Sequence, residues 1–160
     1  MTENIKIETT RFGTVEVPGD KVIKFQEGIP GFEGLKSYVL LDHDSEGLFK
    51  WMQSVDDPDI AFLLTLPDVF IPGFALPKKG VQTASIGLKE SEEPVLMVMV
   101  CVPVGEADFI TLNLKGPIVF NDNNMSAMQC IVDNDDFPCD YKVSISRESA
   151  EASTEASQNL

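Results

Sequence analysis

The sequence predicts an all-β fold, arranged as an antiparallel barrel or sandwich. Two observations predict it. Short apolar runs, several of them alternating with polar residues, recur along the chain, which is typical of strands. Clusters of Gly, Pro, Asn and Asp separate these runs at regular intervals, as turns do in all-β proteins. A length of 160 residues suits one domain with a substantial core.

The first half of the chain contains six expected strands and one demanding loop. The strands are expected at 5–8, 15–17, 22–25, 37–41, 49–53 and 60–66. Gly13 provides a tight connection between the first two. The stretch QEGIPGFEGL, residues 26–35, combines three glycines with a proline, so we expect an ordered loop with special backbone angles.

The second half begins with a proline-punctuated segment and returns to strands. Pro67, Pro72 and Pro77 prevent one regular element, and 78–88 is a candidate for a short helix. Strands are expected at 95–102, 109–114, 118–120, 128–132 and 143–145, with turns at 42–47, 121–124 and 133–136. We expect the apolar run 95–102 to be buried on both faces, and a bend or bulge at Gly116-Pro117.

The charge balance limits the classes of partner. Twelve basic residues against 26 acidic ones give a net charge of −14. Binding a nucleic-acid backbone needs clustered Lys and Arg, and an anionic membrane would repel such a chain, so we expect neither direct nucleic-acid nor membrane binding. We see no secretory leader at the N-terminus, and an odd cysteine count fits reduced thiols, which together predict a cytoplasmic protein.

No arrangement of residues indicates an enzyme, a cofactor or a metal site. His43 is the only histidine and lies in a polar turn, so a solvated side chain is favoured over a catalytic base. Cys101, inside an apolar run, is expected to behave as a small core residue, and a structural role is also favoured for Cys130 and Cys139. The Asn- and Asp-rich turns lack the glycine and distal glutamate of a calcium-binding EF-hand loop.

The stretch WMQSVDDPDIAF, residues 51–62, places an acidic turn between two apolar runs. Asp57 can hydrogen-bond the backbone ahead of it, and Pro58 favours a turn. The turn lies close to the only tryptophan, Trp51, which suggests an aromatic and acidic surface patch. At strand spacing, however, such an aromatic residue belongs more often to the core.

Four stretches together resemble the FliW family of flagellar assembly factors. They are RFGTVEV (11–17), KFQEGIPGFEGLKSYVLL (24–41), FKWMQSVDDPDIAFLL (49–64) and TLNLKGPIVFN (111–121). The resemblance covers about residues 5–143. It implies a small antiparallel β-barrel-like domain with a short helical or irregular insert, in a non-enzymatic protein of the bacterial cytoplasm.

The same resemblance implies the partners. FliW-family proteins bind flagellin and the RNA-binding translational regulator CsrA, and the two partners exchange on them. Free flagellin thereby sets how much CsrA represses flagellin translation, and CsrA is antagonised without occupation of its RNA-binding surface.

The chain departs from the family pattern in three places. Gly116 stands where members often carry alanine, and the C-terminal region, with Phe137 near a usual tyrosine, differs from the family signature. The residues after 145 extend the chain. We therefore expect one FliW-like β domain at 1–145 and a disordered tail at 146–160, because the tail has too few large apolar residues to offset its ordering entropy.

Three functional hypotheses follow. The leading one is a flagellin-binding assembly factor and CsrA antagonist. The alternative is an acidic nucleic-acid mimic that blocks the RNA groove of a basic protein, and the third is a small hydrolase built around His43.

Candidate contact residues come from the two most distinctive motifs. The acidic turn offers Asp56, Asp57 and Asp59 for electrostatic contact. A neighbouring loop offers Ile29, Pro30, Phe32 and Glu33. The competing interpretation is that GIPGFE and SVDDPD only form two demanding turns.

Overall fold

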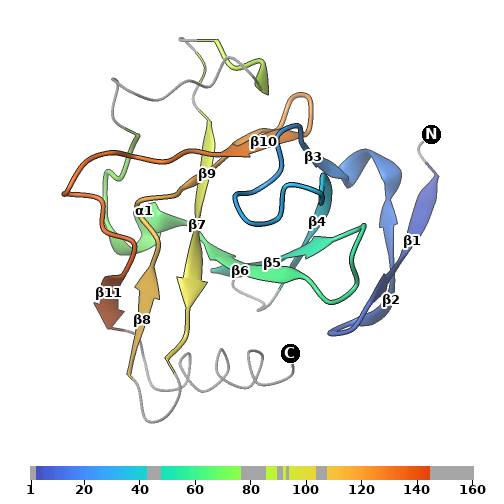
Figure 1. Cartoon of the computed structure of the whole chain (residues 1–160), viewed down its shortest axis with the longest axis horizontal. Coiled ribbons are helices and arrows are strands. Elements are labelled where there is room, and N and C mark those ends of the chain that lie inside the picture. Colours follow the sequence, from blue (N-terminus) through green and yellow to red (C-terminus); the bar gives the residue numbers. More distant parts are fainter. Residues whose placement is uncertain are drawn as a thin grey trace.

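The computed structural model describes residues 3–42, 48–76, 86–89, 92, 94–103 and 108–144. This part of the chain is mostly β-strand, which confirms the predicted fold class (Figure 1). The strands are β1 (Asn4–Thr9), β2 (Gly13–Pro18), β3 (Ile23–Phe25), β4 (Ser37–Asp42), β5 (Phe49–Ser54), β6 (Ala61–Thr65), β7 (Val95–Cys101), β8 (Phe109–Leu112), β9 (Ile118–Asn121), β10 (Ser126–Gln129) and β11 (Tyr141–Ser144). A 3-10 turn, η1 (Gly19–Lys21), and a one-turn helix, α1 (Pro67–Phe70), complete the described elements.

Seven of these strands close into a barrel. They follow the order β7-β6-β5-β4-β3-β10-β9, and β9 pairs back onto β7. All neighbours are antiparallel except β3 and β10, which form a parallel seam of two residue pairs, Lys24–Ser126 and Phe25–Ala127. β8 also pairs with β7, and β11 pairs with β8, so these two strands extend the sheet beyond the barrel.

The predicted bend at Gly116-Pro117 separates β8 from β9. β8 pairs with Val100 and Cys101 of β7, whereas β9 pairs with the residues from Val95 to Met97. The chain from 109 to 121 therefore runs along β7 in two successive segments. The pairing is interrupted at Pro117, which has no amide hydrogen to donate to the ladder.

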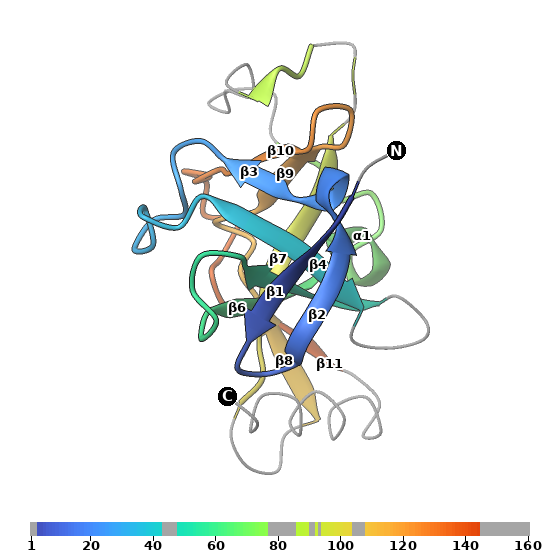
Figure 2. The ribbon, with the colours of Figure 1, turned by 90° about the vertical axis from the view of Figure 1, so that its right-hand side faces the viewer.

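β1 and β2 form a separate hairpin against the barrel (Figure 2). Its turn contains Gly13 at φ 69°. The hydroxyl of Thr9 donates to the carbonyl of Gly13 (2.7 Å) and accepts from the amide of Phe12 (2.8 Å). The hairpin and tight connection predicted from the alternating sequence are confirmed.

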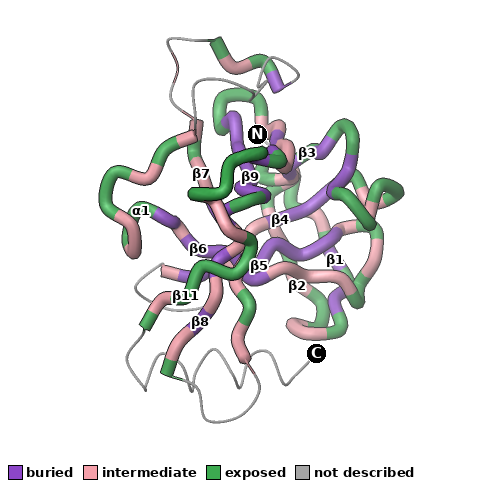
Figure 3. The backbone as a smooth tube through the Cα atoms, turned by 60° about the vertical axis from the view of Figure 1, so that its left-hand side comes forward, coloured by how far each residue is buried: buried purple, intermediate pink, exposed green. Residues whose placement is uncertain are grey.

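The barrel interior is the first hydrophobic core. Its buried members come from all seven barrel strands and from the loop after β3, and include Phe25, Ile29, Tyr38, Met52, Leu64, Met97, Ile118, Phe120 and Ala127. Buried backbone follows β4, β5 and β6 through the molecule (Figure 3). The residues that enter this core, such as Tyr38, Met52 and Leu64, lie on the face of each strand that points into the barrel. Successive residues of a barrel strand alternate between this face and the outer one.

A second core covers the outer face of the barrel. Phe49, Trp51 and Leu63 face outward from β5 and β6 and pack with Ile110 and Leu112 of β8. Partly buried residues of the hairpin, α1 and the segments beside them close this cluster: Phe12, Phe70, Ile71 and Phe74.

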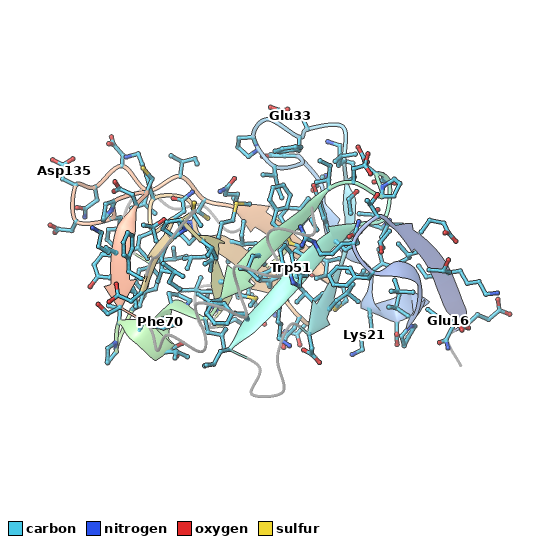
Figure 4. The ribbon with its side chains drawn as sticks, turned by 90° about the horizontal axis from the view of Figure 1, so that it is seen from below. Glu16, Lys21, Glu33, Trp51, Phe70 and Asp135 are labelled. Atoms are coloured by element: carbon cyan, nitrogen blue, oxygen red, sulfur yellow. The ribbon has the colours of Figure 1, made fainter. Side chains whose placement is uncertain are left out.

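Trp51 therefore belongs to the core, and the idea of an exposed aromatic patch is wrong. Its side chain is 3% exposed. The ring of Phe12 packs edge-on at 6.1 Å, and the guanidinium of Arg11 lies 3.8 Å from the indole centroid. Figure 4 shows Trp51 in the middle of the molecule.

Four other expectations need correction. β7 is not buried on both faces, since Val95 is exposed and Cys101 is exposed at the strand end rather than in the core. Burial on both faces occurs in β5, which is covered by the barrel interior and by the second core.

β10 begins at Ser126, two residues earlier than expected, because its residues must pair with β9 and β3. Cys139 is exposed, whereas Cys130 is buried, which raises the pKa of its thiol.

Several expectations concern residues outside the described ranges. These are His43 with most of the 42–47 turn, residues 78–85 of the expected helix, and the tail from 146 to 160. The described helix, α1, instead starts at Pro67, which occupies the first helical turn where no amide donor is needed. No helix in the described part of the chain is long and apolar enough to cross a membrane.

Candidate protein-interaction site

Ser54 and Asp57 build the acidic turn between β5 and β6. The hydroxyl of Ser54 accepts hydrogen bonds from the amides of Asp56 (3.1 Å) and Asp57 (2.9 Å). The carboxylate of Asp57 accepts from the amide of Asp59 at 2.9 Å. Asp57 thus bonds the backbone ahead of it, as its position before a proline predicted.

Gln53 supports this turn from inside the protein. Its side chain is fully buried, and Nε2 donates to the carbonyls of Ser54 (3.0 Å) and Ile60 (3.1 Å). Neither Gln53 nor Ser54 was predicted from the sequence as part of the site. A serine hydroxyl often accepts hydrogen bonds from the backbone amides two and three residues further along the chain, and this pattern would have indicated Ser54. No local pattern indicates that Gln53 is buried.

Asp56 joins the turn to the loop that follows β3. Its Oδ2 accepts from the amides of Lys36 and Ser37, both at 3.2 Å. The amide of Val55 donates to the carbonyl of Ser37 at 2.9 Å. Burial raises the pKa of Tyr38 to about 12, and the charge of Asp56 adds to that rise.

The β1–β2 hairpin holds the other side of the turn. The amide of Thr10 donates to the carbonyl of Pro58 at 2.9 Å, and the hydroxyl of Thr10 donates to the carboxylate of Asp59. Thr10 and Asp59 are 49 residues apart, so no local pattern predicts this contact.

The loop at 26–35 is ordered by its glycines and by a small aromatic contact. Gly28 and Gly31 have φ values of 73° and 89°. The amide of Phe32 donates to the carbonyl of Ile29 at 2.7 Å, and the ring of Phe32 packs edge-on against Phe62 at 5.2 Å. The predicted special backbone angles are confirmed.

Glu33 stabilises the tip of this loop. Its carboxylate accepts from the amide of Gly31 at 3.1 Å. Hydrogen bonds from the amides of Glu33 itself and Gly31 hold the pKa of this carboxyl below its usual value, and the charge of Lys36 contributes. Figure 4 places Glu33 at the outer end of the loop.

The structure therefore brings the two predicted segments together and sorts their residues by exposure. Asp56, Asp59, Pro30 and Glu33 are exposed, Asp57 and Phe32 are half-buried, and Ile29 is buried. Ile29 offers no side chain to a partner in this arrangement. Three of the exposed members, Asp56, Asp59 and Glu33, carry carboxylates. Among the described residues, no three His, Cys, Asp or Glu side chains are grouped to hold a metal ion.

Comparison with known proteins assigns this architecture. The family model described as FliW protein matches residues 6–143. The chain belongs to the FliW family. Relatives share this assignment: a flagellar assembly factor FliW of Thermoanaerobacter pseudethanolicus is 36% identical over 134 residues, covering 83% of this chain and 89% of the relative. Another, from Desulfitobacterium hafniense strain Y51, is 36% identical over 139 residues, covering 87% of this chain and 91% of the relative.

A solved structure agrees with the FliW assignment. The crystal structure of the flagellar assembly factor FliW matches with a TM-score of 0.75 and 28% identity. The match covers 86% of this chain and 96% of that chain. The fold and the assignment as a flagellar assembly factor are therefore consistent across sequence and structure.

Proposed function

We propose that this FliW-family chain binds flagellin and a CsrA-type RNA-binding regulator in the bacterial cytoplasm. By binding the regulator it relieves repression of flagellin translation, and it leaves the RNA-binding surface of the regulator open. The proposed role is that of a non-enzymatic chaperone and translational antagonist.

The observation that carries the proposal is the acidic surface beside the loop at 26–35, in a chain of net charge −14. Asp56 and Asp59 are exposed, and the backbone around them is fixed from the hairpin, from the loop and from Gln53. A rigid acidic surface speeds encounter with a basic regulator and loses little entropy on binding.

Mixing the full-length protein with the CsrA-type regulator and flagellin of its host tests the proposal. We expect complexes at micromolar concentration and low salt, with flagellin displacing the regulator. The absence of both complexes would refute the proposed function.

Competition with RNA separates the proposal from the nucleic-acid mimic. If the regulator still binds this chain when saturated with RNA, the mimic is excluded. If RNA displaces the chain with a steep dependence on salt, the mimic is favoured and the non-competitive mechanism is wrong.

Paired charge-neutralising variants test the contact residues. The double variant D56N/D59N removes two charges and retains oxygen acceptors for the backbone amides and Thr10. We expect the affinity for the regulator to fall about tenfold, since each exposed ion pair contributes up to about 1 kcal/mol, while the melting temperature is unchanged.

The matched control is D133N/D135N, which removes two exposed charges from the other acidic turn. Asp135 lies at the far end of the molecule from the hairpin (Figure 4). Equal losses of affinity in the two double variants would show that net charge alone acts. A fall in melting temperature with unchanged affinity for D56N/D59N would assign the carboxylates to the turn only.

A further inference from the structure

Both edges of the β1–β2 hairpin lie outside the barrel sheet, since β1 and β2 pair only with each other among the described strands (Figure 2). At the open end of the hairpin the amide of Gly19 donates to the carbonyl of Glu3 at 3.0 Å, which makes these two facing residues a hydrogen-bonded pair. Hydrogen-bonded pairs alternate along an antiparallel ladder, so the backbone groups of Asn4, Lys6 and Glu8 point away from β2. Among the described backbone hydrogen bonds, none uses these outward groups.

The two edges differ in how readily they can accept another strand. On β2 the outward positions are Thr14, Glu16 and Pro18, and the proline has no amide hydrogen to donate. On β1 all three outward positions carry an amide hydrogen, and their side chains are exposed. Because a proline is one of the features that protect a strand edge from pairing, β2 is protected at one end and β1 is the open edge.

The charges of β1 complement a second copy of β1. Charged side chains on an edge oppose pairing unless the incoming strand places the opposite charge beside them. In an antiparallel pair of two β1 strands centred on Ile7, Lys6 of each copy faces Glu8 of the other, and these are pairs of the hydrogen-bonded type. Centring the pair on Lys6 instead would place two lysines face to face. The charges therefore favour the register centred on Ile7, which contains two ion pairs related by symmetry.

The neighbours of these two side chains within the hairpin leave room for the second copy. The carboxylate of Glu8 accepts from the hydroxyl of Thr14 at 2.9 Å, which is a neutral donor, and a carboxylate can accept several bonds. Lys6 faces Glu16 across the hairpin, and no ion pair within 4.0 Å joins them among the described residues. Glu16 lies at the outer end of the molecule (Figure 4). In the paired arrangement Lys6 lies between two carboxylates, so positive and negative charges alternate along this row of the sheet.

We propose that two copies of this chain associate through their β1 edges and form one four-stranded sheet in the order β2-β1-β1-β2. Each of the two Lys6–Glu8 pairs exchanges two backbone hydrogen bonds and adds one ion pair. A strand edge is a small interface beside the roughly 1,200 Å² typical of stable complexes, and two chains of net charge −14 repel each other. Association is therefore reversible, with an expected dissociation constant of about 0.1 to 1 mM. The proposal does not depend on binding of flagellin or the CsrA-type regulator.

Sedimentation equilibrium and amide NMR spectra of the full-length protein test this inference. Both are recorded over a range of concentrations up to about 1 mM, at physiological salt, which screens the net charge beyond about 8 Å. We expect the average mass to rise toward that of a dimer, and the amide signals of Lys6 and Glu8 to shift with concentration. The amides of Ile5 and Ile7 point toward β2 and should shift less.

Charge-reversal variants of β1 test the register. K6E places carboxylates opposite carboxylates and E8K places lysines opposite lysines, so each should weaken self-association at least about tenfold. An equimolar mixture of K6E and E8K restores opposite charges in both pairs and has the same total charge as two unchanged chains, so a mixed dimer should form as readily as the original one. The matched control is K21E, which changes the charge of an exposed lysine on η1 by the same amount as K6E and should leave association nearly unchanged.

Four results would overturn the proposal. They are a monomer mass at every concentration, equal weakening by K6E and K21E, the absence of a mixed dimer from K6E and E8K, and a rise in mass without shifts at Lys6 and Glu8. The last would show that the copies associate through another surface. The amide spectra also show whether each variant is folded, and the comparison of K6E with K21E suffices if E8K is not.

Discussion

Replacing Gly28 with alanine should destabilise the protein by about 3 kcal/mol. At φ 73° the left-handed conformation alone costs an alanine about 1 to 2 kcal/mol. The added Cβ would also lie 2.6 Å from Cα and 2.7 Å from the carbonyl oxygen of Glu33. These are backbone atoms of a hydrogen-bonded loop, so relieving the clash costs about another 1 to 3 kcal/mol.

Two further glycines of the same loop provide matched controls. Gly31 has φ 89° but nothing within 4 Å of an added Cβ, so G31A should cost only the backbone term of about 1 to 2 kcal/mol. Gly34 has neither a left-handed φ nor a close neighbour, so G34A should be neutral or stabilising by up to about 1 kcal/mol.

Urea unfolding of the three full-length variants, followed by the fluorescence of Trp51, measures the series. The expected order of destabilisation is G28A, then G31A, then G34A. If G28A lowers the free energy of unfolding no more than G31A does, the loop backbone moves to accommodate the methyl group. That result would contradict the rigidity assumed for this loop in the interaction site.

Three more predictions concern single groups. NMR titration of Glu33 should give a pKa below the ordinary glutamate value of about 4.3. Because the folded-state pKa of Glu33 is lowered, its ionised carboxylate should stabilise the protein above about pH 4.3. This stabilisation should be lost as the pH falls through the folded-state pKa. E33Q should remove this contribution to the pH dependence of stability. Y38F should be neutral or stabilising by about 1 kcal/mol, because the buried Tyr38 hydroxyl has no hydrogen-bond partner among the residues that the structure describes. It should also remove the stability lost as the pH rises from about 10 through the folded-state pKa of about 12, and clear destabilisation at neutral pH would imply a bound water. G116A should cost about 1 kcal/mol, because its Cβ would lie 2.6 Å from Gln129 Nε2 and displace that group from the Gly116 carbonyl; on a Q129A background the cost should vanish in a double-mutant cycle.

Strand and turn positions could be predicted from the sequence because they depend on local chemistry. Alternating residues produced the β1–β2 hairpin, and in the strand expected at 109–114 the alternating residues Ile110, Leu112 and Leu114 are all buried. The glycines of GIPGFE produced the left-handed angles of the loop. These features need only the preferences of a few neighbouring residues.

Burial could not be predicted in the same way, because it depends on which strands become neighbours. β7 is more apolar in sequence than β5, yet β5 is the strand covered on both faces. The second core exists because β8, the hairpin and α1 fold over the outer face of the barrel. No pattern within residues 49–54 indicates that covering layer.

The candidate site was predictable in position but not in its connections. Both motifs were recognised, and they do lie together, through Asp56 and the amides of Lys36 and Ser37. The contacts of Thr10 and the buried support from Gln53 required the folded chain. Whether the exposed carboxylates contact a partner stays a prediction for the charge variants to test.

The two-residue seam between β3 and β10 has a consequence for the order of folding. β3 to β6 are joined by short connections, so their antiparallel pairings form at small cost in loop-closure entropy. The seam joins Lys24 to Ser126, and few contacts compensate for closing so long a stretch of chain. The barrel should therefore close last along this line, and amide hydrogen exchange should detect its transient reopening there before the β4–β5–β6 meander exchanges.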